Sequence, residues 1–157
     1  MSNGYEPLLE YAVEIAAPPA EVWELVSDVR RIPRWSPQVN STRLREGYDR
    51  VELGTQFTNR NSHGDLEWIT HGEIVRFEVE REVAFRIQEN WAIWSFRLEA
   101  TEGGGTRLTE RRETPDGISD VSLELTDGYM GGQAEFTKTQ RAGIRQTLEG
   151  IKAAAES

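Results

Sequence analysis

Cysteine is absent from this sequence, and histidine occurs only twice among its 157 residues. Without thiols, the chain can form no disulfide and offers neither a thiol nucleophile nor a thiolate metal ligand. The two histidines, His63 and His71, do not form a metal-binding motif through their spacing alone. We therefore expect no metal site and no cofactor.

The chain also lacks a long apolar run and an excess of positive charge. No stretch approaches the roughly 20 apolar residues that a membrane-spanning helix needs. The 18 lysines and arginines are outnumbered by 27 aspartates and glutamates, a net charge of −9, which on average repels a nucleic-acid backbone or an anionic membrane surface. Residues 1–7 show neither the basic nor the apolar part of a secretory signal. We expect no nucleic-acid partner, no membrane insertion and a cytoplasmic location.

The length favours a single domain, spanning residues 1–157, with a core of its own. Residues 8–16 alternate between apolar and polar side chains, which predicts a strand with one wet face. Pro18-Pro19 then opens a helix, because proline is tolerated in a first helical turn. Ser27-Asp28 can cap a second, short helix, which we expect to end near Pro33.

Six further strands follow in the middle of the chain, separated by short turns that mostly contain glycine. We expect them at residues 39–45, 55–62, 66–78, 83–89, 91–101 and 106–114. One long helix is expected at the end, over residues 133–155. The predicted fold class is therefore α+β: one strand, two helices, six strands and a final helix. The short connections favour a seven-stranded, curved antiparallel sheet wrapped around the long C-terminal helix.

The final helix has an inner face that changes from apolar to polar along its length. Its second half carries an apolar stripe at helical spacing, formed by Ile144, Leu148, Ile151 and Ala155. Towards the start of the helix, the same stripe passes through the residues Gln133, Thr137, Gln140 and Arg141. This first half either lines a cavity or faces solvent, and the helix alone leaves both interpretations open.

Two strands carry polar residues on the face that their apolar residues turn towards the core. Phe57 places Asn59 and Asn61 on the inner face, and a later strand similarly carries Glu110 and Arg112 inward. An unpaired buried polar group costs about 1 to 3 kcal/mol, so these side chains need partners. Glu110 and Arg112 either pair with each other, pair with charges across the sheet or meet a ligand. The two asparagines either lie near the strand end in contact with water or line a cavity.

Large aromatic residues are more numerous than one small core usually needs. They are Trp23, Trp35, Phe57, Trp68, Phe85, Trp94 and Phe96. Each alone is consistent with a place in the core, but together they can also line an apolar cavity that binds a small molecule. In the strands at 83–89 and 91–101, the residues expected to face inward are Val83, Phe85, Ile87 and the even positions from Ala92 to Ala100. The alternate residues, including Ala84 and Ser95, are expected on the outer face.

Two segments do not follow a simple pattern. In the strand at 66–78, Trp68 has even parity and Phe77 has odd parity, which predicts a bulge near His71-Gly72 that resets the register. His71 therefore has no predicted face. Residues 115–131 show weak periodicity, and a loop of this length is either a lid over the mouth of the cavity or a solvent-exposed connector.

Several short strings occur in the same order as in a known superfamily. They include Pro18-Pro19-Ala20-Glu21-Val22-Trp23, Arg34-Trp35-Ser36-Pro37, Gly54-Thr55-Gln56-Phe57, Trp94-Ser95-Phe96-Arg97-Leu98 and Gly104-Gly105-Thr106-Arg107-Leu108-Thr109-Glu110. Over roughly residues 8 to 155, the chain resembles the START-like, helix-grip superfamily (SRPBCC), and within it the polyketide cyclase/dehydrase and lipid-transport group. The resemblance implies a deep hydrophobic cavity between the sheet and the C-terminal helix. It specifies the fold more closely than the function, because the group contains cyclases as well as carriers of lipids and hormones.

We expect a hydrophobic small molecule, such as a polyketide, a lipid or an isoprenoid, to bind in that cavity. The expected ligand contacts are Trp35, Phe57, Asn59, Asn61, Trp68, Phe85, Trp94, Phe96, Arg112, Gln133, Thr137 and Gln140. Whether the chain acts as a monomer or a homodimer is left open by the sequence.

Two other functions remain as alternatives. In a polyketide aromatase/cyclase or dehydratase, Arg112 or Arg141 would polarise a carbonyl and Glu110 would move a proton. The third hypothesis is a protein-interaction module, which ranks last because of the net charge of −9.

Overall fold

The described part of the chain begins with a strand and ends with one long helix. In this computed structural model it comprises residues 8–119, 122, 126 and 132–157. Its elements are β1 (Leu8–Ile15), α1 (Pro19–Val26), the 3-10 helix η1 (Val29–Arg34), β2 (Val39–Leu44), β3 (Gln56–His63), β4 (Leu66–Glu78), β5 (Glu82–Ile87), β6 (Ile93–Ala100), β7 (Thr106–Glu113) and α3 (Gln133–Glu156). Each predicted strand is found within two residues of its expected ends.

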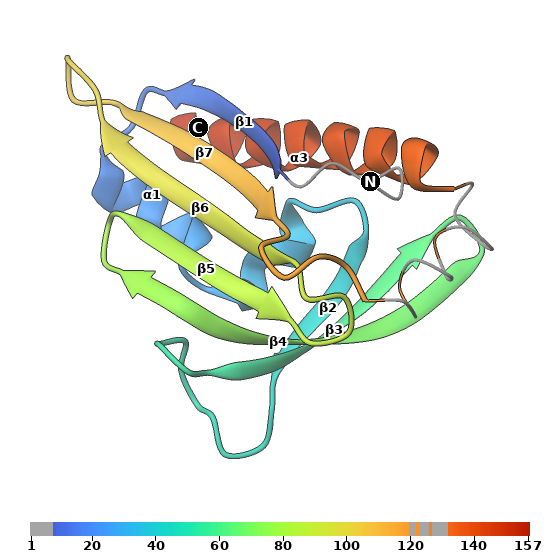
Figure 1. The fold of residues 1–157 in the computed structure, drawn as a ribbon. Helices are drawn as coiled ribbons and strands as arrows, with labels where there is room; N and C mark the ends of the chain where they lie inside the picture. The colour runs from blue at the N-terminus through green and yellow to red at the C-terminus, as the bar shows by residue number, and fades with distance from the viewer. Residues whose placement is uncertain (1–7, 120–121, 123–125, 127–131) are drawn as a thin grey trace.

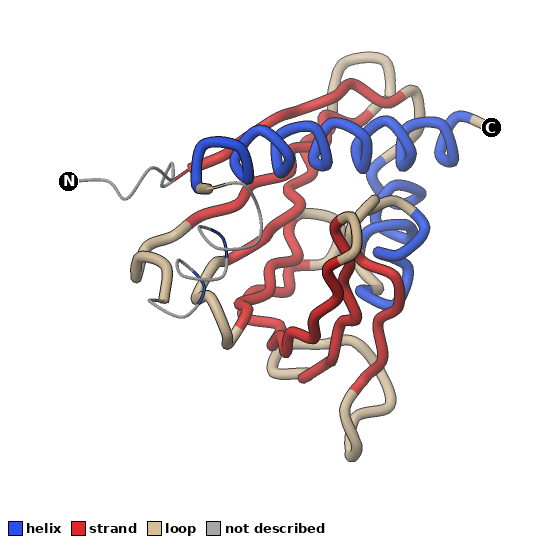
Figure 2. Tube along the Cα trace, turned by 90° about the vertical axis from the view of Figure 1, so that its right-hand side faces the viewer, coloured by secondary structure: helices blue, strands red, loops and turns tan. Residues whose placement is uncertain are grey.

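The seven strands form one sheet in the order β1-β7-β6-β5-β4-β3-β2. Every neighbouring pair is antiparallel. The first strand, β1, lies at one edge of the sheet and pairs with β7. The sheet curves, and α3 runs along β1 and across the open side of the curve (Figure 1, Figure 2). The predicted fold class, a curved antiparallel sheet with a long C-terminal helix, is confirmed.

Prolines and an aspartate define the two short helical segments after β1. Pro18 precedes α1 with an extended backbone, and Pro19 takes its first position, where a missing N–H leaves no bond unmade. Asp28 caps η1, since its side chain accepts a hydrogen bond from the Arg30 N–H at 2.9 Å. η1 continues one residue past Pro33, where we predicted its end, because the fixed φ of proline also suits a 3-10 helix.

The second half of α3 packs on the core through the predicted apolar stripe. Ile144, Leu148 and Ile151 are buried, and Ala155 packs against the core beside them. The last turn is also tied to the chain just after β1, because Glu156 accepts a hydrogen bond from the Ala16 N–H at 2.8 Å. These contacts hold the end of the helix at β1, and its first half extends across the sheet towards β3 and β4 (Figure 1).

The predicted irregularity in β4 exists, but its predicted position was wrong. Pairing between β3 and β4 stays regular through Gly72, and the register shift lies between Ile74 and Arg76, against β5. The shift returns Phe77 to the inner face, where it packs against the core. Gly72 suggested a bulge because glycine often marks one, but here the ring of Phe57 fills the space that a β-carbon would occupy.

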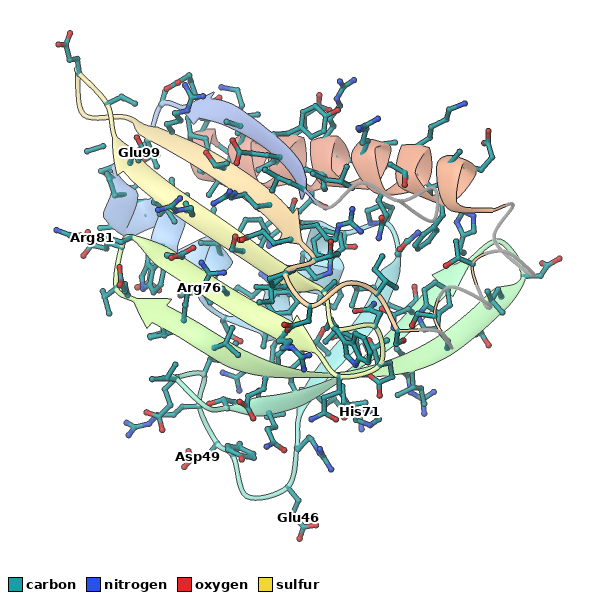
Figure 3. All side chains as sticks on the ribbon, in the orientation of Figure 1. Glu46, Asp49, His71, Arg76, Arg81 and Glu99 are labelled. Atoms are coloured by element: carbon teal, nitrogen blue, oxygen red, sulfur yellow. The ribbon has the colours of Figure 1, made fainter. Side chains whose placement is uncertain are left out.

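Part of the outer face of the sheet is covered by other side chains. Ala84 and Ser95, expected on the outer face, are register partners on β5 and β6 and are fully buried. On the same face, Arg76 of β4 forms ion pairs with β5 and β7, with its guanidinium 3.1 Å from Glu82 Oε2 and 3.3 Å from Glu113 Oε1 (Figure 3). Long charged side chains can cover small residues in this way while their charged ends remain in contact with water.

Candidate ligand-binding site

A cavity of about 280 Å³ lies between the sheet and the first half of α3. Strands β3 to β7 contribute to one side, and η1 with the segment leading into β2 contributes to another. The volume is close to the lower end of the range of roughly 300 to 1,000 Å³ for small-molecule sites. The cavity therefore suits a compact ligand.

Four of the predicted aromatic contacts line the cavity, and two do not. The four are Trp68, Phe85, Trp94 and Phe96. Phe57 is fully buried behind the lining, where its ring lies edge to face with that of Phe85 at 5.3 Å between centroids. Trp35 packs instead against Gly150 of α3. Residue type cannot separate these cases, because a core ring and a cavity ring are equally large and apolar.

Both inward asparagines of β3 are buried and line the cavity. Asn59 Oδ1 accepts a hydrogen bond from Thr42 Oγ1 at 2.7 Å. Asn61 Nδ2 donates to Thr70 Oγ1 at 3.0 Å and to the Trp68 carbonyl at 3.3 Å. Each amide is thus held by neighbouring strands through one of its two ends. The other end, Nδ2 of Asn59 and Oδ1 of Asn61, has no hydrogen bond to another described residue, so it is available to a ligand.

Glu110 places a carboxyl group in the lining. The residue is only 6% exposed, and no described residue donates a hydrogen bond to its Oε1. Removal from water raises the pKa of Glu110 well above its usual value of 4.5, because burial disfavours the charged form. Arg112, two residues along β7, is 2% exposed but does not line the cavity. The unbonded Oε1 gives no support to the interpretation in which Glu110 pairs with Arg112.

The first half of α3 faces the cavity through a stripe that is offset from the predicted one. The stripe recurs at helical spacing and consists of Phe136, Thr139, Gln140, Gly143, Ile144 and Thr147, of which Ile144 also belongs to the predicted apolar stripe. Of the predicted contacts on this helix, Gln140 belongs to it, whereas Thr137 is buried without lining the cavity. Arg141 lies beside β1, in a separate pocket with Leu8, Leu9, Glu10 and Tyr11. The side chain of Gln133 is not among those that the structure describes.

Phe136, which we did not predict, connects α3 to the far end of the sheet. Its ring lies edge-on to that of His63 at the end of β3, with 6.5 Å between the centroids. The loop at 115–131, for which a lid and an exposed connector were both left open, lies partly outside the described residues. Of its described members, Ser122 and Thr126 line the cavity, and Ser122 Oγ donates to the Glu89 carbonyl at 3.1 Å.

Glu89 is a second carboxylate in the lining and was not predicted as a contact, although the parity of the strand expected at 83–89 places it on the same face as Phe85 and Ile87; in the structure it follows the end of β5. Its Oε1 accepts a hydrogen bond from the His71 N–H at 2.7 Å, and its Oε2 lies 2.6 Å from His71 Nδ1. This contact gives His71, which had no predicted face, a defined partner. Among the described residues, no group of three or more histidines, aspartates and glutamates is placed to hold a metal ion.

A family model described as "Polyketide cyclase / dehydrase and lipid transport" matches residues 7–156. The chain belongs to this family. The match spans nearly all of the sequence and confirms the resemblance seen in the short strings of the strands and helices. A comparison with curated proteins found no match.

Solved structures of similar proteins include the Polyketide_cyc-like protein Cgl2372 from Corynebacterium glutamicum. It is 27% identical to this chain, with a TM-score of 0.60 over 94% of this chain and 90% of its own. Major latex-like protein 151 from Panax ginseng is 16% identical, with a TM-score of 0.69 over 96% and 97%. The di-domain ARO/CYC StfQ from the steffimycin biosynthetic pathway is 15% identical, with a TM-score of 0.71, and this chain spans 50% of its length. At such identities the last two show the fold alone.

Within the described residues of this chain, no helix is long and apolar enough to cross a membrane.

Proposed function

We propose that this family member binds a small, mostly apolar molecule in the cavity beneath α3. The observation that carries the proposal is the composition of the lining. Trp68, Phe85, Trp94 and Phe96 supply apolar surface. Polar residues, including Asn59, Asn61 and Gln140, lie among them, but the surface of the lining is mostly apolar. Small-molecule sites are built in this way, with apolar walls for affinity and a few polar groups for orientation.

The family description and the names of the similar structures support a ligand of this kind. The family is described by cyclisation or dehydration of polyketides and by lipid transport, and both activities involve largely apolar molecules. The small volume favours a compact polyketide-like or isoprenoid-like compound over a long-chain lipid. A protein-interaction module is less well supported, because its interior would have no need for a cavity of about 280 Å³.

A second candidate is an aromatase/cyclase or dehydratase, and Glu110 is the specific observation that favours it. A buried carboxyl with a raised pKa can donate a proton to a reacting oxygen. In that case Glu110→Gln abolishes turnover of a poly-β-keto substrate and leaves its binding largely intact. An equal loss of turnover and binding argues for a binding role alone. Arg112 and Arg141, the predicted carbonyl-polarising residues, do not line the cavity.

The binding proposal is tested by thermal unfolding against a panel of compact polyketide-like, isoprenoid-like and lipid compounds. A ligand at 100 times its Kd stabilises the folded state by about 2.7 kcal/mol. For a chain of this size, that corresponds to a rise in Tm of roughly 5 to 10 °C. Native mass spectrometry of the purified protein shows in parallel whether a molecule is retained.

Two matched tryptophan variants of α3 locate the binding site. Thr139→Trp fills the cavity from the lining stripe, whereas Ala142→Trp adds the same side chain on the exposed side of the helix. We expect the first variant to lose the ligand-induced rise in Tm and the second to retain it. The proposal fails if no compound raises the Tm of the wild-type protein, or if both variants respond equally to the compounds that do.

A further inference from the structure

The ionisable side chains in the cavity lining are of one chemical type. Glu89 and Glu110 line the cavity, and its described lining includes no lysine, arginine or histidine. Glu89 is engaged with His71, at 2.6 Å between Oε2 and Nδ1, and its side chain is 38% exposed. Glu110 is therefore the ionisable group of the described lining that is both buried and without a hydrogen bond at Oε1.

An anionic ligand finds no cation within this lining. A buried charge is tolerated only when it is paired, and an anion here would lose its water without gaining a partner. It would also lie beside two carboxylic acids in a chain with a net charge of −9. A free carboxylate or a phosphate is therefore a poor fit for the part of the ligand that enters the cavity.

An uncharged carboxyl group can donate a hydrogen bond to an uncharged polar ligand. A protonated glutamic acid has one O–H donor in addition to its acceptor oxygens. Burial favours this protonated form, since it raises the pKa of Glu110 well above 4.5. Asn59 adds a second donor, because Thr42 occupies its Oδ1 at 2.7 Å and its Nδ2 bonds to no other described residue. Glu110 and Asn59 can thus donate hydrogen bonds to an oxygen atom of the ligand, whereas the free Oδ1 of Asn61 offers an acceptor.

We propose that the cavity selects an uncharged ligand with a carbonyl oxygen, which accepts a hydrogen bond from the Glu110 side chain. This inference rests on the proposed binding function and specifies the class of ligand. It distinguishes ketones, aldehydes and esters from free acids, from amines and from pure hydrocarbons of the same shape.

Four naphthalene probes of nearly equal size test this selection by isothermal titration calorimetry at pH 7. They are 2-acetylnaphthalene, 2-ethylnaphthalene, 2-naphthoate and 1-(2-naphthyl)ethylamine, which carry a ketone, an ethyl group, a carboxylate and an ammonium group. We expect the ketone to bind about 3- to 10-fold more tightly than the ethyl compound, the factor that one net hydrogen bond supplies. The carboxylate is expected to bind at least about tenfold more weakly than the ketone, because its charge has no partner.

Two variants of Glu110 separate a hydrogen-bond donor from a charge. Glu110→Gln keeps a donor of the same shape, so the preference for the ketone over the ethyl compound should persist. Glu110→Met removes the donor at similar volume, so that preference should disappear while the ethyl compound binds as before. Near-ultraviolet circular dichroism and the Tm of each variant establish that it is folded. The four probes on the wild-type protein decide the question even if Glu110→Met does not fold.

Three results overturn the inference and distinguish it from the proposed function. If the ketone and the ethyl compound bind equally, or the carboxylate binds as tightly as the ketone, the cavity is a binding site without the proposed selectivity. If the amine binds most tightly and Glu110→Gln weakens it, Glu110 acts as a charged partner instead. If none of the four probes binds, the inference fails, and the panel of other apolar compounds then decides whether the binding function fails with it.

Discussion

The aromatic ring of Phe57 on β3 lies directly against the backbone of Gly72 on β4. A β-carbon built on Gly72 would come within 2.3 Å of Phe57 Cζ, well inside van der Waals contact. The two residues are register partners, and Phe57 is fully buried, so its ring has no open space into which it could move. Glycine at position 72 thus leaves the space that the ring of Phe57 fills. Phe57 belongs to β3, the strand that also carries the cavity-lining Asn59 and Asn61.

We predict that Gly72→Ala destabilises the protein by about 1 to 3 kcal/mol, the usual cost of adding a carbon to a filled core. The double variant Gly72→Ala with Phe57→Leu should recover part of this loss, because a smaller side chain makes room for the added methyl group. Urea denaturation of the two single variants and the double variant measures the coupling between the positions. Strictly additive effects of the two substitutions would contradict the contact.

We predict the opposite sign for Gly150→Ala on α3. A β-carbon at position 150 would lie 3.7 Å from Trp35 Cε3, which is an ordinary van der Waals contact. Alanine in a helix interior is more favourable than glycine by about 0.5 to 1 kcal/mol, because it loses less backbone entropy on folding. The free energy of unfolding in urea should rise by this amount. A loss of stability would mean that the packing of Trp35 on α3 tolerates no added methyl group.

Strand periodicity was sufficient to predict most of the sheet. Alternation placed Asn59 and Glu110 on the inner face, and both are buried there. Alternation did not show which residues of the outer face would be buried. Ser95 is fully buried on the outer face, where Arg76 of β4 forms an ion pair with Glu113 of β7 across the intervening strands, and a pattern within one strand contains no information about such neighbours. The bulge was misplaced for a similar reason, since Gly72 serves the ring of Phe57 rather than the register.

Glu110 should make the stability of the protein depend on pH. Its folded-state pKa is raised by burial, so its carboxyl group contributes most to stability below the unfolded-state value near 4.5. That contribution is lost as the pH rises towards the folded-state pKa, by up to about 1.4 kcal/mol for each pH unit. Glu110→Gln removes this titration while preserving the shape of the side chain.

The difference in unfolding free energy between Glu110→Gln and the wild-type protein should therefore shift in favour of the variant between pH 4.5 and pH 8. Urea denaturation at a series of pH values measures it, and the titrations of the other groups cancel in the comparison. A difference that stays constant over this range would show that Glu110 ionises as freely in the folded protein as in the unfolded chain.

The polar residues were no better guides to the cavity than the aromatic residues, since Arg112 and Thr137 are buried without lining it. Asn59, Asn61 and Glu110 line it, because polar groups are tolerated inside a protein only where they find partners or space. Trp35 and Phe57 belong to the core instead, and nothing in residue type distinguishes the two roles. The sequence also did not show which side of the first half of α3 faces the cavity, since this depends on how the distant end of the helix packs on β1.

The hydrogen bond between Thr42 and Asn59 should hold the cavity side of β3 in place. Thr42→Val removes the donor to Asn59 Oδ1, now 2.7 Å away, and leaves a buried acceptor without its partner. We expect a loss of about 1 to 3 kcal/mol in the free energy of unfolding. Thr42→Ser retains the hydroxyl group and should cost less. Equal losses for the two variants would show that the hydroxyl group of Thr42, and with it the hydrogen bond, is not the source of the effect.

The contact between Phe136 and His63 should fasten the first turn of α3 to the end of β3. The second half of the helix is held by buried residues such as Leu148, whereas the first half lies over the cavity and depends on fewer contacts. An edge-to-face ring pair contributes about 0.5 to 1.5 kcal/mol. Phe136→Ala should therefore loosen the start of the helix without unfolding its end.

Hydrogen exchange measures this difference within one helix. In Phe136→Ala, the amides of residues 136–140 should exchange about 2- to 10-fold faster, as the loss of such a contact implies, while those of residues 148–152 keep their wild-type rates. Phe136→Leu retains apolar bulk in the cavity lining but loses the ring pair, so its exchange rates should fall between the two. Faster exchange along the whole helix would indicate global destabilisation, and unchanged rates at residues 136–140 would show that the ring pair does not hold the helix over the cavity.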